Sequence, residues 1–426
     1  MEEKSKNKFK IVTLGCRTNQ YESQAYRDQL LALGYEEVKE GEQAEICIVN
    51  TCTVTESADS SSRHAIRQLA RENTNSQLLV TGCFAERQPE VVKQLGGVTH
   101  VVPNAEKENL LSRIFPEDSV PEFSIKHFES HTRAFVKIQD GCNSFCTYCI
   151  IPYVRGRSRS RVPEDILQEV RELIASGFKE IVITGINVGD YDGGVEKGTP
   201  PITLASLIRL VDQLPGLERL RVSSIDPDEV DEDLADAILN GKNTCHSMHI
   251  VLQSGSNVIL KRMNRKYTRQ VFLETIDRLR AADPDFSFTT DIIVGFPGET
   301  DADFLDTLNV MREVKFAKVH MFPYSDRPRT RSILMPNKVP VDSIKFRKQE
   351  VMRLAEKFAY ELRENYVGRR LQILTENNTA QITSGHTANF LEVIVPDTQL
   401  PSNQLVEVEL LSNTPQGLIG RLIEAD

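Results

Sequence analysis

The chain has 426 residues, of which 40% are hydrophobic and 26% charged, and its net charge is −10. This composition predicts a globular protein of about three domains that can bury a core. The acidic balance excludes a protein that binds nucleic acid over its whole surface, so local basic patches must hold any RNA partner. Apolar runs of about 18 residues are absent and residues 1–6 are polar, so we expect a cytoplasmic protein that does not enter a membrane.

Residues 1–115 alternate short apolar runs with helical patterns. The runs at residues 10–14, 46–49 and 78–81 are typical of buried parallel strands. A helical pattern over residues 22–33 ends at Gly34, where a helix C-cap is expected. We therefore predict a parallel α/β domain over residues 1–115, followed by a polar, proline-bearing linker over residues 116–132.

Residues 133–366 repeat the strand-then-helix pattern six times. We place the strands at residues 134–138, 179–184, 218–223, 247–252, 287–294 and 316–322. Pro163 begins a well-marked helix, Gly177 ends it, and a long charged helix over residues 341–366 closes the region. Successive βα units with right-handed crossovers predict a central, partial (β/α)6 barrel.

Residues 367–426 change to short strands separated by turn residues. Apolar or alternating runs lie at residues 371–374, 391–395 and 405–410. About 60 residues with this pattern predict a small antiparallel β-barrel. The region carries three arginines and no lysine against seven carboxylates, so it cannot be a strong electrostatic clamp for RNA.

Three cysteines in a C-x3-C-x2-C loop give the strongest chemical signal. Cys142, Cys146 and Cys149 follow directly after a predicted strand. Three thiolates can each bind one iron of a [4Fe–4S] cluster and leave the fourth iron open to a small molecule. The alternatives are a zinc site, which normally needs four ligands, or buried thiols. In a cytoplasmic chain a disulfide framework is disfavoured.

Three further cysteines each follow a predicted parallel strand of the first region. Cys16, Cys52 and Cys83 lie just past the three strand ends, and the carboxyl ends of parallel strands share one edge of a sheet. We therefore expect these thiols to converge on a second cluster, although each alone could be an ordinary buried side chain. Cys47 lies within a strand and Cys245 precedes one, so we expect both to pack in the core.

A run of alternating arginines follows the three-cysteine loop. Arg155, Arg157, Arg159 and Arg161 in an extended segment would all project to one side and could contact phosphates or a substrate carboxylate. A solvated basic edge is the alternative.

The six cysteines and the three-part layout together resemble the methylthiotransferases. These are radical S-adenosylmethionine (SAM) enzymes, and the loop from Gly141 to Cys149 is similar to the signature of that superfamily. Residues 13–23 (Thr-Leu-Gly-Cys-Arg-Thr-Asn-Gln-Tyr-Glu-Ser) most resemble the MtaB branch, which acts on N6-threonylcarbamoyladenosine next to the tRNA anticodon. The resemblance implies that residues 367–426 form a TRAM-like RNA-binding module, in which Arg369 and Arg370 would contact RNA.

The resemblance also implies the chemistry. Two [4Fe–4S] clusters would be held by Cys142, Cys146 and Cys149 and by Cys16, Cys52 and Cys83. One SAM molecule would methylate a sulfur at the second cluster. Another would be cleaved at the first cluster, and its 5′-deoxyadenosyl radical would remove the hydrogen from C2 of the adenine, which then takes the methylthio group. The partners implied are the tRNA anticodon loop and an electron donor such as a flavodoxin or ferredoxin.

SAM should lie at the strand ends of the barrel, where such folds place their ligands. The candidate residues are small or polar and follow four successive strands: Thr184, Gly185, Asn187, Ser223, Ser224, Gln253, Ser254, Gly295 and Glu299. Residues 295–299 could instead be a turn that precedes a helix, because Thr300 and Asp303 form a capping-box pattern.

Two alternatives for the function remain open. A methylthiotransferase of this kind could act on isopentenyl-adenosine in tRNA or on a ribosomal-protein side chain. A non-catalytic iron–sulfur protein is a third and more distant possibility.

Overall fold

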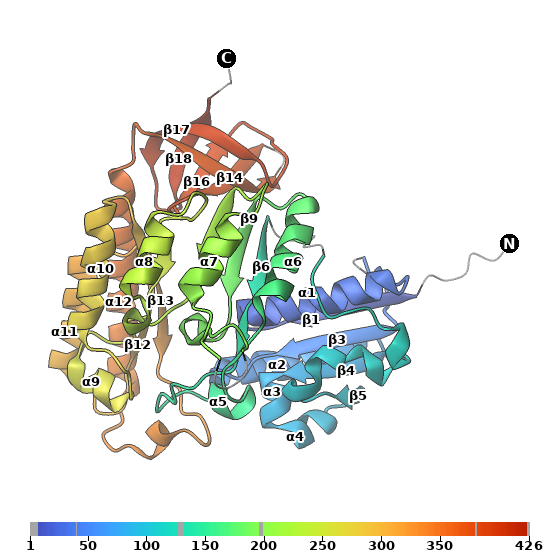
Figure 1. Ribbon diagram of the computed structural model, residues 1–426. Coiled ribbons are helices and arrows are strands. Elements are labelled where there is room, and N and C mark those ends of the chain that lie inside the picture. The colour runs from blue at the N-terminus through green and yellow to red at the C-terminus, as the bar shows by residue number, and fades with distance from the viewer. Residues whose placement is uncertain (1–6, 40, 127–131, 196–198, 380, 424–426) are drawn as a thin grey trace. The chain divides into compact units, whose positions relative to one another are not determined.

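The structure is a computed structural model that describes residues 7–39, 41–126, 132–195, 199–379 and 381–423 (Figure 1). Its contacts divide the chain into two compact units. Unit 1 consists of the described residues within 1–128, 140–159 and 325–333, and unit 2 consists of those within 129–139, 160–324 and 334–426. This division differs from the three consecutive domains expected from the sequence, because the segment 140–159 groups with the N-terminal residues.

Unit 1 contains a five-stranded parallel sheet. Its strands lie in the order β2-β1-β3-β4-β5. Their bounds are β1 (Lys8–Thr13), β2 (Glu36–Glu37), β3 (Ile46–Thr51), β4 (Gln77–Gly82) and β5 (Val98–Val101). The parallel α/β fold and the three strands expected in this region are confirmed.

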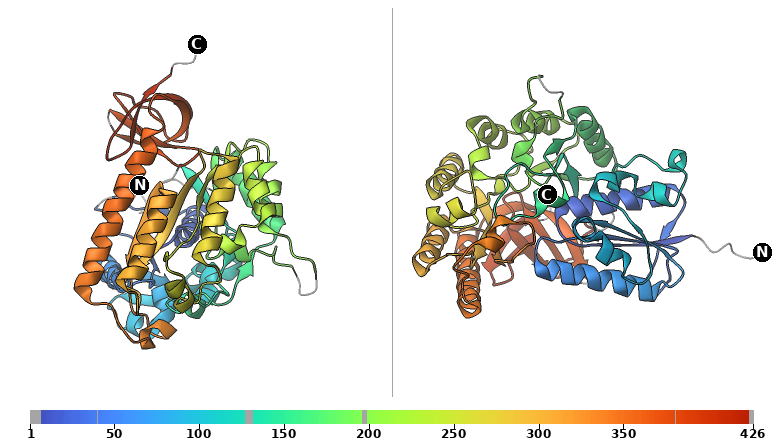
Figure 2. Two further views of the ribbon diagram at one scale, coloured as in Figure 1. Left: turned by 90° about the vertical axis from the view of Figure 1, so that its left-hand side faces the viewer. Right: turned by 90° about the horizontal axis from the view of Figure 1, so that it is seen from below.

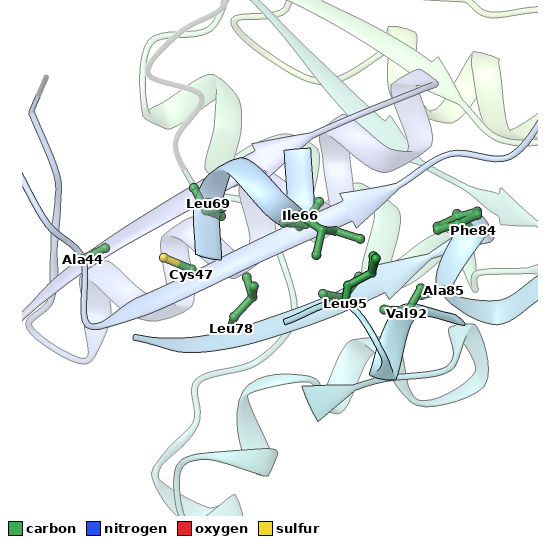
Figure 3. Close-up of a cluster of buried hydrophobic side chains, with 11 residues drawn as sticks. Ala44, Cys47, Ile66, Leu69, Leu78, Phe84, Ala85, Val92 and Leu95 are labelled. Carbon is green, nitrogen blue, oxygen red and sulfur yellow. The ribbon is translucent and has the colours of Figure 1, made fainter. Parts of the chain in front are cut away.

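Helices α1 (Arg17–Ala32) and α2 (Glu56–Glu72) cover opposite faces of this sheet (Figure 2, right). Side chains alternate between the faces along a strand, so Ile48 packs with α1 while Cys47 and Val49 pack with α2. Figure 3 shows Cys47 in the apolar cluster beside α2. Cys47 is fully buried there, and the expectation that it packs in the core is confirmed.

Short helices complete unit 1. They are α3 (Cys83–Arg87), α4 (Pro89–Lys93), α5 (Ile151–Val154) and the 3-10 turns η1 (Asn104–Asn109), η2 (Leu111–Arg113), η3 (Glu117–Ser119) and η6 (Arg331–Leu334). The expected linker is packed rather than extended over residues 116–126. The ring centroids of Phe123 and Tyr26 lie 5.3 Å apart, and Ile125 is fully buried. The rest of that stretch, residues 127–131, lies outside the described residues.

Unit 2 is built on six parallel strands. They are β6 (Arg133–Lys137), β9 (Glu180–Thr184), β10 (Arg219–Val222), β11 (Ser247–His249), β12 (Ser287–Val294) and β13 (Lys318–Pro323). Two three-stranded sheets, β10-β9-β6 and β11-β12-β13, are joined by parallel bridges from Leu220 to Thr244 and from Ile225 to Ile250. The expected partial (β/α)6 barrel is confirmed.

Helices surround these strands (Figure 1). They are α6 (Pro163–Ala175), α7 (Leu204–Asp212), α8 (Glu232–Leu239), α9 (Asn257–Arg262), α10 (Arg269–Ala282), α11 (Asp301–Val314) and α12 (Val341–Glu364), with the 3-10 turns η4 (Val188–Asp190) and η5 (Pro227–Glu229). The two-residue strands β7 (Gln139–Asp140) and β8 (Arg159–Ser160) flank the segment 140–159. No helix in the described part of the chain is both long and apolar enough to cross a membrane.

The C-terminal strands form a closed five-stranded barrel within unit 2. Its order is β14-β15-β16-β18-β17, with β14 (Arg370–Thr379), β15 (Ile382–Thr387), β16 (Glu392–Pro396), β17 (Leu405–Asn413) and β18 (Leu418–Leu422). The small barrel expected from the sequence is confirmed. One strand pair, β16 with β18, is parallel, so the barrel is not antiparallel throughout.

A buried group of charges joins the C-terminal barrel to the six-stranded sheet. Nε atoms of Arg133 and Arg221 lie 2.8 and 2.7 Å from Glu180 Oε1, and the Glu180 side chain is fully buried. Arg221 also donates to the carbonyl oxygens of Thr387 and Ala388 at 2.8 Å. Burial alone would raise the pKa of Glu180, but Arg221 and Arg133 outweigh burial and lower it to about 2.

Replacing Glu180 by Ala should destabilise the protein. We expect a loss of about 3–5 kcal/mol in the free energy of unfolding, because buried guanidinium groups would be left without their carboxylate. Urea unfolding of Glu180→Ala measures this loss. The control Glu218→Ala, at an exposed position next to β10, should change the free energy by less than about 0.5 kcal/mol. Equal losses in the two variants would contradict the role given to Glu180.

Candidate functional site

Three cysteines lie at the carboxyl edge of the sheet in unit 1, as expected. Cys16 is the N-cap residue of α1, Cys52 directly follows β3, and Cys83 is the first residue of α3. Gly15 has φ +100°, and a Cβ atom there would lie only 3.0 Å from Cys52 Sγ. A side chain at position 15 would therefore push the loop of Cys16 away from Cys52.

The thiols of Cys16, Cys52 and Cys83 are free and close enough to influence one another. Burial and the neighbouring Cys83 and Cys16 raise the pKa of Cys52 to about 11. Burial also raises the pKa of Cys83, and the charge of Arg155 opposes that rise. The thiols of Cys52 and Cys83 therefore hold their protons at neutral pH unless a positively charged partner displaces them.

The C-x3-C-x2-C loop belongs to the same compact unit. The backbone N–H of Cys142 donates to Gly156 O at 3.1 Å, and that of Cys149 donates to Cys146 O at 3.0 Å. Gly141 has φ +76°, and a Cβ there would collide with the carbonyl oxygen of Arg157. The sharp turn before Cys142 therefore needs glycine. Both cysteine sets thus lie in unit 1.

Four charged side chains are buried together in unit 1. Lys107 Nζ lies 2.6 Å from Glu22 Oε1 and also contacts Asp140. Arg155 Nη1 lies 3.0 Å from Glu22 Oε1 and 2.9 Å from Asp140 Oδ1. Burial opposes the charge of Arg155, but Glu22 and Asp140 outweigh it and raise the pKa of the guanidinium well above its ordinary value. The same carboxylates raise the pKa of Lys107 against the effect of burial, so both cations stay charged inside the protein.

Arg155 also contacts one of the strand-end cysteines, which are Cys16, Cys52 and Cys83. Its Nε donates to Cys83 Sγ at 3.3 Å, and its Nη2 donates to Asn19 Oδ1. Asn19 Oδ1 in turn lies 3.7 Å from Cys16 Sγ. All three nitrogens of the guanidinium thus donate to groups of unit 1.

The four alternating arginines do not project to one side, so that expectation is wrong. Arg155 is drawn inward by Glu22 and Asp140, and its side chain is fully buried. Arg157 lies over the ring of Phe145, with its Cζ atom 4.4 Å from the ring centroid. Arg161, in unit 2, contacts Glu169 at 2.6 Å. Arg159 has a side chain that is 56% exposed.

The polar side chains that surround the cysteines were not predicted from the sequence. Asn19 and Glu22 follow Cys16 on one face of α1 and are almost fully buried. Asn50 Nδ2 donates to Glu22 Oε2 at 3.2 Å. One signal was present in the sequence: residues 18, 19, 22 and 23 are all polar, so the first turns of α1 lack the apolar stripe of a core helix.

A single metal ion does not fit this arrangement. In the part of the chain that the structure describes, no group of three or more His, Cys, Asp or Glu side chains is placed to bind one ion. An iron–sulfur cluster needs a different geometry, because each thiolate binds its own iron and the sulfurs stay apart. Three thiols at one sheet edge, with a guanidinium donating to one of them, fit the donor set of such a cluster.

The expected SAM residues lie at the strand ends of unit 2. Thr184, Gly185 and Asn187 follow or end β9, Ser223 and Ser224 follow β10, Gln253 and Ser254 follow β11, and Gly295 and Glu299 follow β12. The amide oxygen of Gln253 is buried without a hydrogen-bond partner among the described atoms, and its φ is +61°. An unsatisfied buried acceptor on a strained backbone fits a ligand that donates a hydrogen bond.

The turn at residues 295–299 has a structural role. Glu299 Oε2 accepts from Gly295 N at 2.6 Å and pairs with Arg347 at 2.7 Å. Thr300 and Asp303 form the capping box of α11. The expected capping box is confirmed, while Glu299 Oε1 is buried without a hydrogen-bond partner within the described chain.

Glu229 was not predicted from the sequence. Its Oε1 accepts from Asn187 Nδ2 at 2.9 Å. Burial and the nearby charge of Asp226 raise the pKa of Glu229 to about 7. Such a pKa in a carboxyl group beside a candidate ligand residue is typical of functional sites. The only signal in the sequence was its place after β10, seven residues beyond Val222.

The two arginines at the start of the C-terminal barrel differ. Arg369 forms a two-pronged ion pair with Asp285, with one N–O distance of 2.9 Å. Arg370 is exposed. Cys245 is buried, and the expectation that it packs in the core is confirmed.

Two family models match the chain. The model described as the radical SAM superfamily matches residues 136–311, and the model described as uncharacterized protein family UPF0004 matches residues 8–103. The first covers most of the strands of the partial barrel, and the second covers the sheet that carries the strand-end cysteines.

Several curated proteins are similar over almost the whole chain. The threonylcarbamoyladenosine tRNA methylthiotransferase MtaB of Chlamydia pneumoniae is 50% identical over 98% of this chain and 99% of its own length. The protein of the same name from Bacillus subtilis (strain 168) is 34% identical over 94% of this chain and 92% of its own length. A tRNA-2-methylthio-N(6)-dimethylallyladenosine synthase of Clostridium perfringens (strain SM101 / Type A) is 35% identical over 98% of both chains.

A solved structure shares the fold. The radical S-adenosylmethionine methyltransferase TsrM from Kitasatospora setae superposes with a TM-score of 0.54 at 14% identity, and the match covers 75% of each chain.

The protonation of Glu229 should make stability depend on pH. A pKa raised from about 4.5 to about 7 means that the folded state holds this proton more tightly than the unfolded state. The resulting stabilisation is complete below about pH 4.5 and is lost as the pH rises through 7. We expect the free energy of unfolding of Glu229→Gln, relative to the natural chain, to rise by about 3 kcal/mol between pH 4.5 and pH 8.5.

The measurement is urea unfolding of both proteins across this range. Glu232→Gln, at an exposed position on α8, is the matched control and should follow the natural chain at every pH. A constant difference between Glu229→Gln and the natural chain would contradict the raised pKa.

Proposed function

This chain belongs to the tRNA methylthiotransferases of the radical SAM superfamily, and on that premise we propose that it converts N6-threonylcarbamoyladenosine at tRNA position 37 into the 2-methylthio derivative. The observation that best supports this proposal is the similarity to a relative named for that nucleoside, which is 50% identical over nearly its full length. The Gly-Cys-Arg-Thr-Asn sequence at residues 15–19 agrees with it.

We assign six of the cysteines of unit 1 as the ligands of two [4Fe–4S] clusters, and Cys47 is not among them. Cys142, Cys146 and Cys149 would hold one cluster and Cys16, Cys52 and Cys83 the other. When bound, the clusters and two SAM molecules supply C–H activation at C2 of the adenine and the methylthio group that replaces the hydrogen. The protein contributes binding, orientation and charge.

The protein must stabilise thiolates at a site where Cys83 is buried and Cys52 is half-buried. The pKa of Cys52, about 11, shows that this thiol stays protonated at neutral pH in the absence of metal. Iron binding would therefore release protons, as at other thiolate sites. The sheet edge holds Cys16, Cys52 and Cys83 in place beforehand, so little conformational entropy is lost on binding.

The strand ends of unit 2 would bind SAM. Its ammonium and hydroxyl groups are hydrogen-bond donors, and the buried oxygens of Gln253 and Glu299 still have the capacity to accept. Ser223, Ser224, Ser254 and Thr184 add short hydroxyl groups, and Gly185, Asn187 and Gly295 complete the proposed set. Glu229 would orient Asn187 through the 2.9 Å hydrogen bond.

The anticodon loop of tRNA would be held by exposed cations. Arg157, Arg159 and Arg370 are exposed and suited to phosphates. Arg155, Arg161 and Arg369 were expected to contact RNA or substrate, but each is engaged by a carboxylate of the chain. A cytoplasmic location and an electron donor such as a ferredoxin or flavodoxin complete the proposal.

A second substrate has a specific observation in its favour. Relatives named for dimethylallyladenosine are as similar to this chain as some of those named for threonylcarbamoyladenosine, at 35% and 34% identity. An isopentenyl-type adenosine is therefore the alternative substrate to test.

Mass spectrometry of tRNA nucleosides tests the proposal. Expressed in a host that lacks its own methylthiotransferases, the chain should produce 2-methylthio-N6-threonylcarbamoyladenosine. Cys146→Ala should abolish the product, and Cys47→Ala, in the apolar cluster beside α2, is the matched cysteine control. Appearance of only the 2-methylthio derivative of isopentenyl-adenosine would move the substrate to the alternative, and no methylthio nucleoside at all would contradict the proposed reaction.

A further inference from the structure

The guanidinium of Arg155 lies against a sulfur of the strand-end cysteines. Its Nε–H donates to Cys83 Sγ at 3.3 Å, inside a fully buried environment. Arg155 follows the last cysteine of the other set, Cys149, by six residues. The segment that carries one cysteine set thus supplies a hydrogen-bond donor to the other set.

The orientation of this donor is fixed from several directions. Nη1 of Arg155 is held by Glu22 and Asp140, at 3.0 and 2.9 Å. Nη2 donates to Asn19, whose own amide donates to Leu14 O at 2.6 Å and to Thr51 O at 3.1 Å. Leu14 directly follows β1 and precedes Cys16 by two residues, and Thr51 is the last residue of β3 and directly precedes Cys52.

The contacts of Lys107 show what is special about Arg155. Lys107 already contacts both Glu22 and Asp140, so each carboxylate has a cation without Arg155. The four charges, two positive and two negative, balance. What Arg155 adds, and the ammonium of Lys107 does not, is a planar group that reaches the carboxylates on one side and a sulfur on the other.

We propose that Arg155 is a positioning residue that tunes the cluster on Cys16, Cys52 and Cys83 and makes it easier to reduce. The inference rests on the proposed function, which assigns a cluster to these cysteines. An N–H donor and a positive charge beside a cluster sulfur favour the reduced, more negative state and so raise the reduction potential. Glu22, a carboxylate in the same group, has the opposite effect: its negative charge disfavours further negative charge at the sulfur of Cys83.

The opposite signs of Arg155 and Glu22 allow a direct test. The full chain carrying Cys142→Ala, Cys146→Ala and Cys149→Ala keeps only the cluster on the strand-end cysteines. After anaerobic reconstitution with iron and sulfide, its reduction potential is measured by a redox titration followed by electron paramagnetic resonance. The added variants are Arg155→Gln, Glu22→Gln and, as the control, Arg67→Gln at an exposed position on α2.

We expect Arg155→Gln to shift the potential to more negative values and Glu22→Gln to shift it to more positive values, with Arg67→Gln unchanged. Both substitutions break the same ion pair. If Arg155 acted only by holding the fold, the two variants would therefore change the cluster in the same way. Shifts of the same sign, or no shift with Arg155→Gln, would overturn the proposal.

Three further outcomes are distinguished by iron uptake. If Arg155→Gln takes up no iron, Arg155→Lys replaces it in the test. This variant keeps a positive charge near Glu22 and Asp140 but lacks the Nε–H donor. We then expect a negative shift of the reduction potential that is smaller than the shift expected for Arg155→Gln. If both Arg155 variants fail to bind iron while Arg67→Gln binds it, Arg155 is a structural residue and the proposal is wrong. If the background protein itself binds no iron, the cluster assignment fails first, and the tuning role fails with it.

Discussion

The buried ion pairs of Glu22, Asp140, Lys107 and Arg155 decide how unit 1 is composed. Glu22 comes from α1 and Lys107 from η1, while Asp140 and Arg155 belong to the cysteine-bearing segment 140–159. Charges buried to this extent are costly unless every one of them is paired. Separating the segment from the sheet would break the pairs Lys107–Asp140 and Arg155–Glu22 and leave each buried charge with one partner fewer, so these pairs keep the two cysteine sets in one compact unit.

The sheet supplies the second constraint. Parallel strands end at the same edge, and Cys16, Cys52 and Cys83 each lie at or just past such an end. This arrangement could be predicted because the apolar runs and the glycines mark the strands and their ends. The three-cysteine loop could be predicted from its spacing alone, since the local sequence from Gly141 to Cys149 specifies the turn.

The partners of these cysteines could not be predicted in the same way. Arg155 appeared to be one of four alternating surface arginines, and only the distant Glu22 and Asp140 explain why it turns inward. Glu229 acquires its pKa of about 7 mainly from burial, which the local sequence does not reveal, and further from Asp226, three residues earlier in the chain. Long-range electrostatic pairing is a property of the folded chain, whereas strand, turn and helix patterns are local.

The C-terminal barrel shows the same contrast between local patterns, which could be predicted, and long-range contacts, which could not. Its short strands follow from their alternation, but its attachment depends on Arg219 and Arg221, which donate to carbonyl oxygens of β14, β15 and the turn after β15. The barrel is acidic, Arg369 pairs with Asp285, and the exposed Arg421 pairs with Glu409, while Arg370 is exposed near the junction with α12. The barrel therefore offers little positive charge to a polyanion such as RNA.

The iron content of the reconstituted protein tests the central claim most directly. Two cysteine sets that each hold a [4Fe–4S] cluster require about eight irons per chain. The triple replacement of Cys16, Cys52 and Cys83 by Ala should reduce this to about four, the triple replacement of Cys142, Cys146 and Cys149 should do the same, and Cys245→Ala should leave it unchanged. About four irons in the natural chain, or no loss in either triple variant, would contradict the account.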